Sequence, residues 1–469
     1  MAVIKDSVVK SSINRPSLAA WTFLMGWLWW DLPTVLALDR AKSPVVMILT
    51  FGQPADAGSF PKCVWFIVGL MLVGFSYPAL CRRLIQWRRS WQRIYLAGYA
   101  ALAGGSLPLL SHDLLSYIGE AQMAAVFHRN PLSTLIANIP HWQHDFWLAH
   151  AGWAHSITPY GPLWAEWETL SGHLTHPFWQ QFIWIKASNV VMVLATAYLL
   201  GHRVGRARGL GFALHPLVGL ELLANGHNDA ALIFLMVLGY GAYQRRRYLA
   251  FALFWSLATG IKFVPLILLP ILLVGLSAFD QVLILVVGAA ALTAMYLLDW
   301  PGFPFLLAPW ANQSLDLRSF DFILQGGLSH LLRSSRTVDR HLATLGGVLV
   351  WIVILLERGK RFLGIKGDPI ILGDLLIAFA LIGLSWFQYW YLLWALPFYL
   401  LSNHPRAPRM VFWLGWVEAI QVLAWPTYPD FADRQILQFA MIWLSLGVTA
   451  FRIRAWIHTH FHDLKEGTS

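Results

Sequence analysis

Two short polar motifs interrupt long apolar stretches of this sequence, and both carry side chains suited to acid–base chemistry. The first is Ser111-His112-Asp113-Leu114-Leu115-Ser116-Tyr117, and Glu120 follows two helical turns after its aspartate. A positioned carboxylate can take a proton from an attacking hydroxyl group. Asp113 is therefore the candidate general base, and Glu120 is a second catalytic candidate that could orient its surroundings. The structural alternative for Asp113 is a helix cap.

The second motif is Asn225-Gly226-His227-Asn228-Asp229, which follows an apolar segment containing Glu221. An ionisable side chain within an apolar membrane segment costs free energy unless it has a partner, so it often marks a functional site. We expect Glu221, His227, Asn228 and Asp229 to contact a substrate, with helix capping as the alternative for Asp229. These residue types could also hold a divalent metal. No spacing among them is typical of a metal site, and we expect neither a metal nor an organic cofactor.

Two cationic side chains are candidates for binding an anionic group. Lys262 lies between Gly260 and Pro265, where we expect a break between two short helices. A lysine there can bind phosphate as a point charge, or it can extend to the lipid headgroups. Arg340 ends a group of arginines in a later polar connection and is the second candidate, with a solvated loop as its alternative.

The composition indicates a membrane protein that is entirely helical. Hydrophobic residues make up 57% of the 469 residues, charged residues 12%, and tryptophans number 26, whereas soluble domains carry about 25% charge. Lipid requires spanning segments to bond their backbones internally, which favours helices. The net charge of +10 comes from short basic clusters between apolar runs, as expected for cytoplasmic loops, and does not indicate a nucleic-acid partner.

The chain reads as one integral membrane domain, residues 1–469, with about fourteen spans. The basic clusters all fall on one side if both termini are cytoplasmic, which predicts a multi-pass protein of the cell membrane. Two long connections, about 111–177 and 299–341, then lie on the non-cytoplasmic face. Within the first, residues 114–127 and 164–174 have helical spacing and are predicted to be amphipathic surface helices.

The order of these motifs resembles the GT-C fold of polytopic glycosyltransferases. Within that fold the chain is most similar to the bacterial polyprenol-phosphate-mannose-dependent alpha-mannosyltransferases. The resemblance runs from about Asp113 to Pro397, with Leu132 and Gln388 as departures from the family pattern. It is carried by Asp113-Leu114-Leu115-Ser116-Tyr117 with Gly119 and Glu120, Asn130-Pro131, Tyr160-Gly161-Pro162-Leu163-Trp164, Gly226-His227-Asn228-Asp229-Ala230, Lys262 with Pro265, and Tyr389-Trp390-Tyr391-Leu392-Leu393-Trp394.

The resemblance implies a membrane glycosyltransferase that moves a hexose, most simply mannose, from a polyprenyl-phosphate donor to a glycan or lipid-linked acceptor. Asp113 would deprotonate the acceptor hydroxyl on the non-cytoplasmic face. Lys262 and Arg340 would hold the donor phosphate. The aromatic side chains at the helix mouths would contact substrate, although tyrosine and tryptophan also mark any membrane interface; they are Tyr117, Tyr160, Tyr389, Trp390 and Tyr391.

A secondary transporter or a lipid flippase is the alternative, because such proteins also place ionisable residues at helix mouths. Transporters usually carry these groups near the bilayer midplane, on broken helices within internal repeats. In this sequence the polar groups gather at one face and no repeat is present, which favours the transferase.

Overall fold

The structure is a computed structural model that describes residues 77–299 and 336–414, apart from short gaps within both ranges. All regular secondary structure in these ranges is helical, which confirms the predicted all-α class. The helices used below are α4 (Arg89–Gly105), α5 (Asp113–Ala125), α6 (Phe146–Ala149), α7 (Pro162–Leu174), α8 (Phe178–Val204), α9 (Arg206–Ala213), η4 (Val218–Ala224), α10 (Asp229–Gln244), α11 (Tyr248–Thr259), α12 (Val264–Leu273), α13 (Ala278–Asp299), α16 (Arg336–Gly364), α17 (Pro369–Ala378), η6 (Phe379–Gly383), η7 (Tyr389–Trp394) and α18 (Leu396–Leu401).

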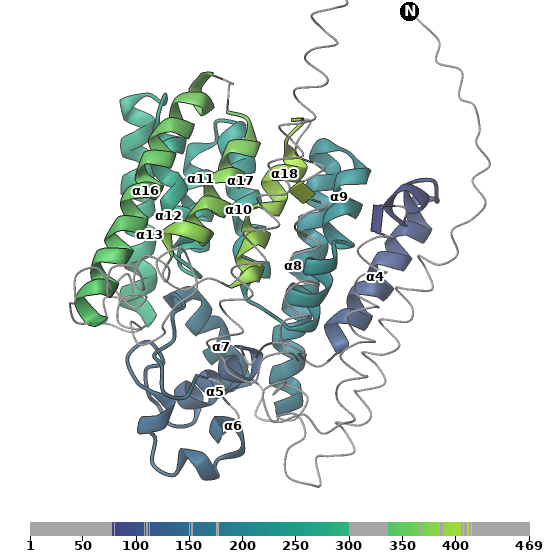
Figure 1. The fold of residues 1–469 in the computed structure, drawn as a ribbon. Coiled ribbons are helices and arrows are strands. Elements are labelled where there is room, and N and C mark those ends of the chain that lie inside the picture. The colour runs from purple at the N-terminus through teal and green to yellow at the C-terminus, as the bar shows by residue number, and fades with distance from the viewer. Residues whose placement is uncertain are drawn as a thin grey trace, which may run out of the picture.

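The long helices form a bundle, and α5, α6 and α7 lie together at one end of it (Figure 1). Helix α8 packs against α4, α9 and α10, while α11 packs between α10 and α13. Apolar side chains from both sides of the bundle form one continuous core. A second, small core beneath α5 joins Met123, Ile136, Ile139, Leu148, Ala151 and Ala154. The end cap is therefore a packed unit of its own, set against the bundle.

Two helices of the described part are long and apolar enough to cross a membrane, within residues 180–204 and 278–295. A third span arises if η4 and α10, which meet at a bend of 111°, count as one. Four further apolar stretches are shorter, from 10 to 17 residues. The predicted number of about fourteen spans is not confirmed within these ranges.

The two surface helices predicted in the first long connection exist as α5 and α7, but α5 does not lie on a surface. All residues of α5 from Asp113 to Ala124 are buried, because α6, α7 and α8 pack around it. The prediction of an amphipathic surface helix was wrong for α5, since its polar residues Glu120 and Gln122 face protein. Helix α7 does expose Leu170 and Leu174. In the second connection, α16 begins at Arg336, and residues 300–335 lie outside the described part.

Candidate active site

Two interruptions of helical structure bring the charged candidates together at the boundary between the bundle and its end cap. Residues 225–228 separate η4 from α10, and residues 260–263 separate α11 from α12, as Gly260 and Pro265 predict. The first interruption carries His227 and leads into Asp229, and the second carries Lys262. Both meet the N-terminal end of α5, where Asp113 is the first helical residue.

Asp113 is buried and accepts contacts from three side chains. Oδ1 accepts a hydrogen bond from the Trp153 indole N–H at 2.9 Å, and Oδ2 accepts one from the Tyr160 hydroxyl at 3.1 Å. His227 Nδ1 lies 3.1 Å from Oδ2. A carboxylate has about four lone-pair positions, so these three contacts leave one for a further donor.

These contacts also set the ionisation of Asp113. Burial raises the pKa of the carboxyl group. The contacts with His227 and the Trp153 N–H, and the charge of Lys262, lower the pKa by more than burial raises it, so that it falls to about 2. Asp113 is therefore ionised at neutral pH. Trp153 was missed in the sequence analysis, because one tryptophan among 26 gives no signal of its own.

His227 lies fully buried between two carboxylates. Its Nε2 is 3.1 Å from Glu221 Oε2, opposite the contact of Nδ1 with Asp113. The ring stacks on Trp390 with centroids 4.1 Å apart and an interplanar angle of 20°. Glu221 also accepts a hydrogen bond from the Asn225 amide at 2.9 Å. The predicted residues Glu221, His227 and Trp390 thus form one cluster that fixes the imidazole against Asp113.

Lys262 and Asp229 form a buried ion pair beside this cluster. Lys262 Nζ lies 2.9 Å from Oδ1 and 2.8 Å from Oδ2 of Asp229, and the Trp394 indole N–H also donates to Oδ1. The ammonium group lies 5.3 Å from the ring centroids of both Tyr160 and Tyr391, within the range of cation–π attraction. The structure therefore places Lys262 in an aromatic cage with a carboxylate partner, instead of extending it to headgroups.

The loop that carries Tyr160 is tied directly to the break that carries Lys262. The Gly161 N–H donates to the Ile261 carbonyl at 2.9 Å, and the Leu163 N–H donates to the Gly260 carbonyl at 2.9 Å. A Cβ atom on Gly161 would lie 2.3 Å from the Gly260 oxygen, so only glycine permits this approach. The close backbone contact explains why the Asp113 and Lys262 groups are neighbours.

Helix α8 supports the interruption at residues 225–228 with two polar side chains that the sequence analysis missed. The buried Lys186 ammonium group donates to the carbonyls of Leu223 and Ala224. The Asn189 amide donates to the carbonyls of Leu222 and His227, at 3.1 and 3.0 Å. Carbonyl groups at the end of a helix lack internal partners and need such donors when buried. These hydrogen bonds join elements that are distant in the sequence, so no local sequence pattern predicts them.

Tyr117 and Asn228 connect α5 to the same interruption. The Tyr117 hydroxyl accepts from the Asn228 N–H at 3.4 Å and donates to the Tyr160 hydroxyl at 3.3 Å. Both residues are fully buried. Within the described part the Asn228 side-chain amide has no hydrogen-bond partner, which leaves it able to bind one. Tyr117 acts in this structure as a link between α5 and the bundle.

The other predicted site residues lie partly beside His227 and Lys262 and partly elsewhere. Tyr391 stacks on Trp394 with centroids 4.5 Å apart, beside Lys262. Tyr389 is buried and packs edge-on against Trp390 at 5.0 Å. Arg340 belongs to α16, and its side chain lies outside the described part. Across the described residues, no group of three or more histidine, cysteine, aspartate or glutamate side chains could hold a metal ion.

Glu120 is paired with Glu168 of α7, and both carboxyl groups are buried. Burial raises the pKa of Glu120, and burial together with the neighbouring Glu120 raises the pKa of Glu168. Two buried carboxyl groups in contact avoid repulsion by retaining a proton. The pair thus joins α5 to α7 in its protonated form.

Glu168→Gln should reduce the loss of stability that the wild-type protein shows as the pH rises. Because the folded-state pKa values of Glu120 and Glu168 are raised, their contribution is full at acid pH and is lost as the pH rises through those values. The wild-type Tm should therefore fall as the pH rises from about 5 to about 8, and the Tm of the variant should fall less. Glu166→Gln, at a partly exposed position of α7, is the control and should follow the wild type. An equal fall for both variants would contradict the protonated pair.

Comparison with known families gives one match. The model of a family described as alpha-(1->6)-mannopyranosyltransferase, N-terminal domain, matches residues 20–278, more than half of the chain. The matched region includes Asp113, His227, Asp229 and Lys262. No curated protein matches the chain.

Proposed function

The chain belongs to the alpha-(1->6)-mannopyranosyltransferase family and is a mannosyltransferase, and from this membership we propose that its donor is a polyprenyl-phosphate mannose. The acceptor is a glycan or a lipid-linked glycan, and Asp113 is the general base. The reaction takes place on the non-cytoplasmic face of the cell membrane, where the basic clusters place residues 111–177.

The observation that supports this proposal is that Asp113 and Lys262 both contact Tyr160, Asp113 at its hydroxyl group and Lys262 at its ring. The Tyr160 hydroxyl donates to Asp113, and its ring lies 5.3 Å from the Lys262 ammonium group. A glycosyl transfer needs a base for the incoming hydroxyl group and a cation for the departing phosphate. A carboxylate and an ammonium group that both contact one aromatic side chain, of a type suited to contact a sugar, support this assignment.

The transfer proceeds by one exchange of bonds at the anomeric carbon. The acceptor oxygen forms a bond to that carbon while its proton passes to Asp113. The bond between the anomeric carbon and the phosphate oxygen breaks, and its electron pair leaves with the polyprenyl phosphate. Lys262 faces the negative charge on the leaving phosphate, and Arg340 is the second proposed cation.

The low pKa of Asp113 defines how the base would act. A carboxylate with a pKa of about 2 is a weak proton acceptor in the resting site. Before the transfer its main contribution is therefore to hold and orient the acceptor hydroxyl group. It takes the proton only as the new bond forms, when the acceptor oxygen becomes strongly acidic.

Purified protein in lipid vesicles should transfer radiolabelled mannose from polyprenyl-phosphate mannose and not from a nucleotide-linked mannose. The reason is that a lipid phosphate donor reaches the site from the bilayer and needs no nucleotide-binding motif, and the sequence contains none. A panel that includes polyprenyl-phosphate glucose tests the sugar. Transfer from the nucleotide donor in the absence of any lipid carrier would contradict the proposal. Movement of lipid without sugar transfer would favour a flippase.

A further inference from the structure

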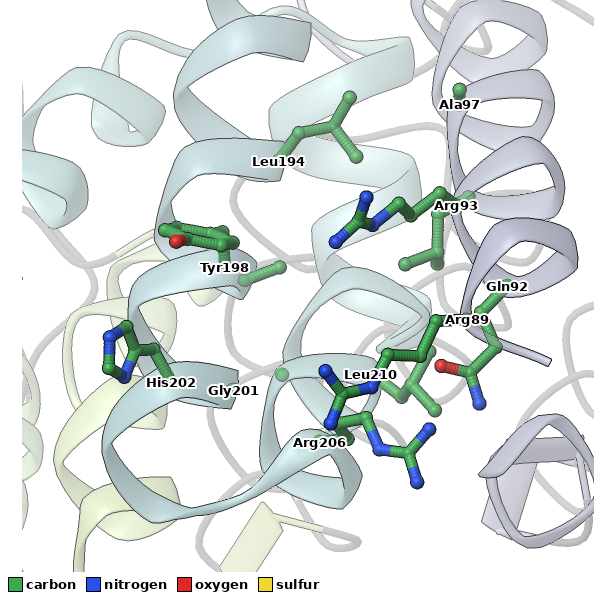
Figure 2. A pocket seen from close by; sticks show the side chains of 13 residues that line it. Arg89, Gln92, Arg93, Ala97, Leu194, Tyr198, Gly201, His202, Arg206 and Leu210 are labelled. Atoms are coloured by element: carbon green, nitrogen blue, oxygen red, sulfur yellow. The ribbon is translucent and has the colours of Figure 1, made fainter. Parts of the chain in front are cut away.

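A cavity of about 750 Å³ lies between α4, α8 and the start of α9, away from the site described above (Figure 2). Lys186 and Asn189 of α8 contact the candidate active site, whereas the cavity extends along the same helix to His202. On α8, the cavity lining begins at Leu194, five positions beyond Asn189, and ends at His202, thirteen positions beyond it, which corresponds to about 8 and about 20 Å along the helix. The cavity is lined by Arg89, Gln92, Arg93, Leu96, Ala97, Leu194, Ala197, Tyr198, Gly201, His202, Arg206, Gly209 and Leu210.

The turn between α8 and α9 builds one wall of this cavity. Gly205 joins the helices with a φ of +102°, a conformation that glycine adopts without strain. Helix α9 then folds back onto α8 so closely that a Cβ atom on Gly209 would lie 2.4 Å from the Ala197 carbonyl oxygen. Small residues thus let α9 pack closely on α8. Arg206, at the start of α9, lines the same cavity as the α4 side chains.

Three arginines line the cavity: Arg89 and Arg206 lie near one another, and Arg93 lies one turn of α4 away from Arg89. Figure 2 shows the side chains of Arg89 and Arg93 extending from α4 toward α8, with the Arg206 guanidinium group beside that of Arg89. The lining contains no acidic side chain. None of the ion pairs found among the described residues involves these arginines. Like charges held together repel one another, so an anion between them would stabilise the arrangement.

The other end of the cavity is apolar and opens along the exposed face of α8. Leu96 and Ala97 of α4 lie opposite Leu194 and Ala197 of α8. The α8 side chains that continue this face are exposed, with Tyr198 at 66% and Val191 at 65%. Since this part of α8 is one of the helices able to cross a membrane, its exposed apolar face is suited to lipid chains.

We propose that this cavity binds an anionic phospholipid. The guanidinium groups of Arg89 and Arg206 hold the headgroup phosphate, Arg93 adds a positive charge one helical turn away, and an acyl chain lies along the apolar wall between α4 and α8. Planar guanidinium groups match phosphate oxygens with paired hydrogen bonds. Basic pockets between membrane helices are sites for anionic headgroups. The sequence predicts that this end of α8 is cytoplasmic, so the bound lipid belongs to the leaflet opposite the proposed reaction.

The proposal is tested by the lipid preference of the full-length purified protein. Fluorescent phosphatidylglycerol should bind about 10- to 100-fold more tightly than fluorescent phosphatidylcholine. A variant with Arg89→Gln, Arg93→Gln and Arg206→Gln should lose this preference. The matched control removes three exposed arginines from the turn between α10 and α11, with Arg245→Gln, Arg246→Gln and Arg247→Gln, and should keep it. Equal binding of both lipids by the wild type would overturn the proposal.

Two further measurements separate this lipid from other occupants. A phosphatidylglycerol with a photoreactive acyl chain should label wild-type residues 89–97 or 194–210, a result that does not depend on the folding of any variant. Soluble glycerol phosphate should not compete with the lipid at the same concentration. Effective competition by glycerol phosphate would assign the cavity to a soluble anion. An absence of labelling in both ranges would overturn the proposal.

Discussion

Asp113→Asn should lower the rate of mannose transfer by about 10²–10⁴-fold, the usual contribution of a general base. The asparagine side chain has the same size, and its single carbonyl oxygen can accept from either Trp153 or Tyr160, which contact different oxygens of Asp113 at 2.9 and 3.1 Å. It cannot take the proton of the acceptor hydroxyl group, however. Binding of the donor should survive, because Asp113 is not proposed to hold the phosphate. Single-turnover rates and donor affinity, measured on the same folded preparation, separate these two effects.

The control for this experiment is Glu120→Gln, on the same helix and also buried. Its partner is Glu168, so we expect a smaller loss of transfer than for Asp113→Asn. Transfer at the wild-type rate by Asp113→Asn would move the base elsewhere, with Asp229 as the next carboxylate to test. An unfolded Asp113→Asn protein would assign Asp113 a structural role through its contacts with Trp153, Tyr160 and His227 instead.

Lys262→Met should both destabilise the protein and abolish transfer. The substitution leaves the fully buried Asp229 carboxylate without its cation, a change that typically costs about 3–5 kcal/mol. It also removes the charge that we propose for the leaving phosphate. The fall in stability is measured as a shift in Tm, and the loss of phosphate contact as a rise in donor KM or a fall in turnover.

A double variant separates these two roles of Lys262. Lys262→Met combined with Asp229→Asn removes the unpaired charge and should recover most of the stability, while transfer should remain low. Lys262→Arg should recover transfer only in part, because a guanidinium fork differs in shape from an ammonium group. Wild-type transfer by the double variant would show that Lys262 serves only as the partner of Asp229.

The charged residues of the candidate site could be predicted from the sequence because each one interrupts an apolar segment. Asp113, His227, Asp229 and Lys262 all stand out in this way, and glycine and proline mark the break at residues 260–263. The pairings among them could not be predicted. That His227 would lie between Glu221 and Asp113 depends on how three distant segments pack, and local spacing contains no such information.

The supporting residues were missed for the same physical reason. Lys186 reads as one cation within an apolar helix, and only the fold brings it to the carbonyls of Leu223 and Ala224. The helical spacing of residues 114–127 correctly predicted α5, but its burial depends on α6 and α7 covering it. Periodicity thus predicted the helix, while its exposure was decided by neighbours distant in the sequence.

The backbone contact between Gly161 and Gly260 has a mechanical consequence. Two hydrogen bonds tie the Tyr160 loop to the Lys262 break, and Tyr160 and Lys262 hold Asp113 and Asp229 in turn. A displacement of the end cap would therefore move the proposed base, Asp113, and the proposed phosphate-binding cation, Lys262, together. Under the proposed function, binding of the acceptor hydroxyl group and release of the lipid phosphate would then depend on the same backbone contact.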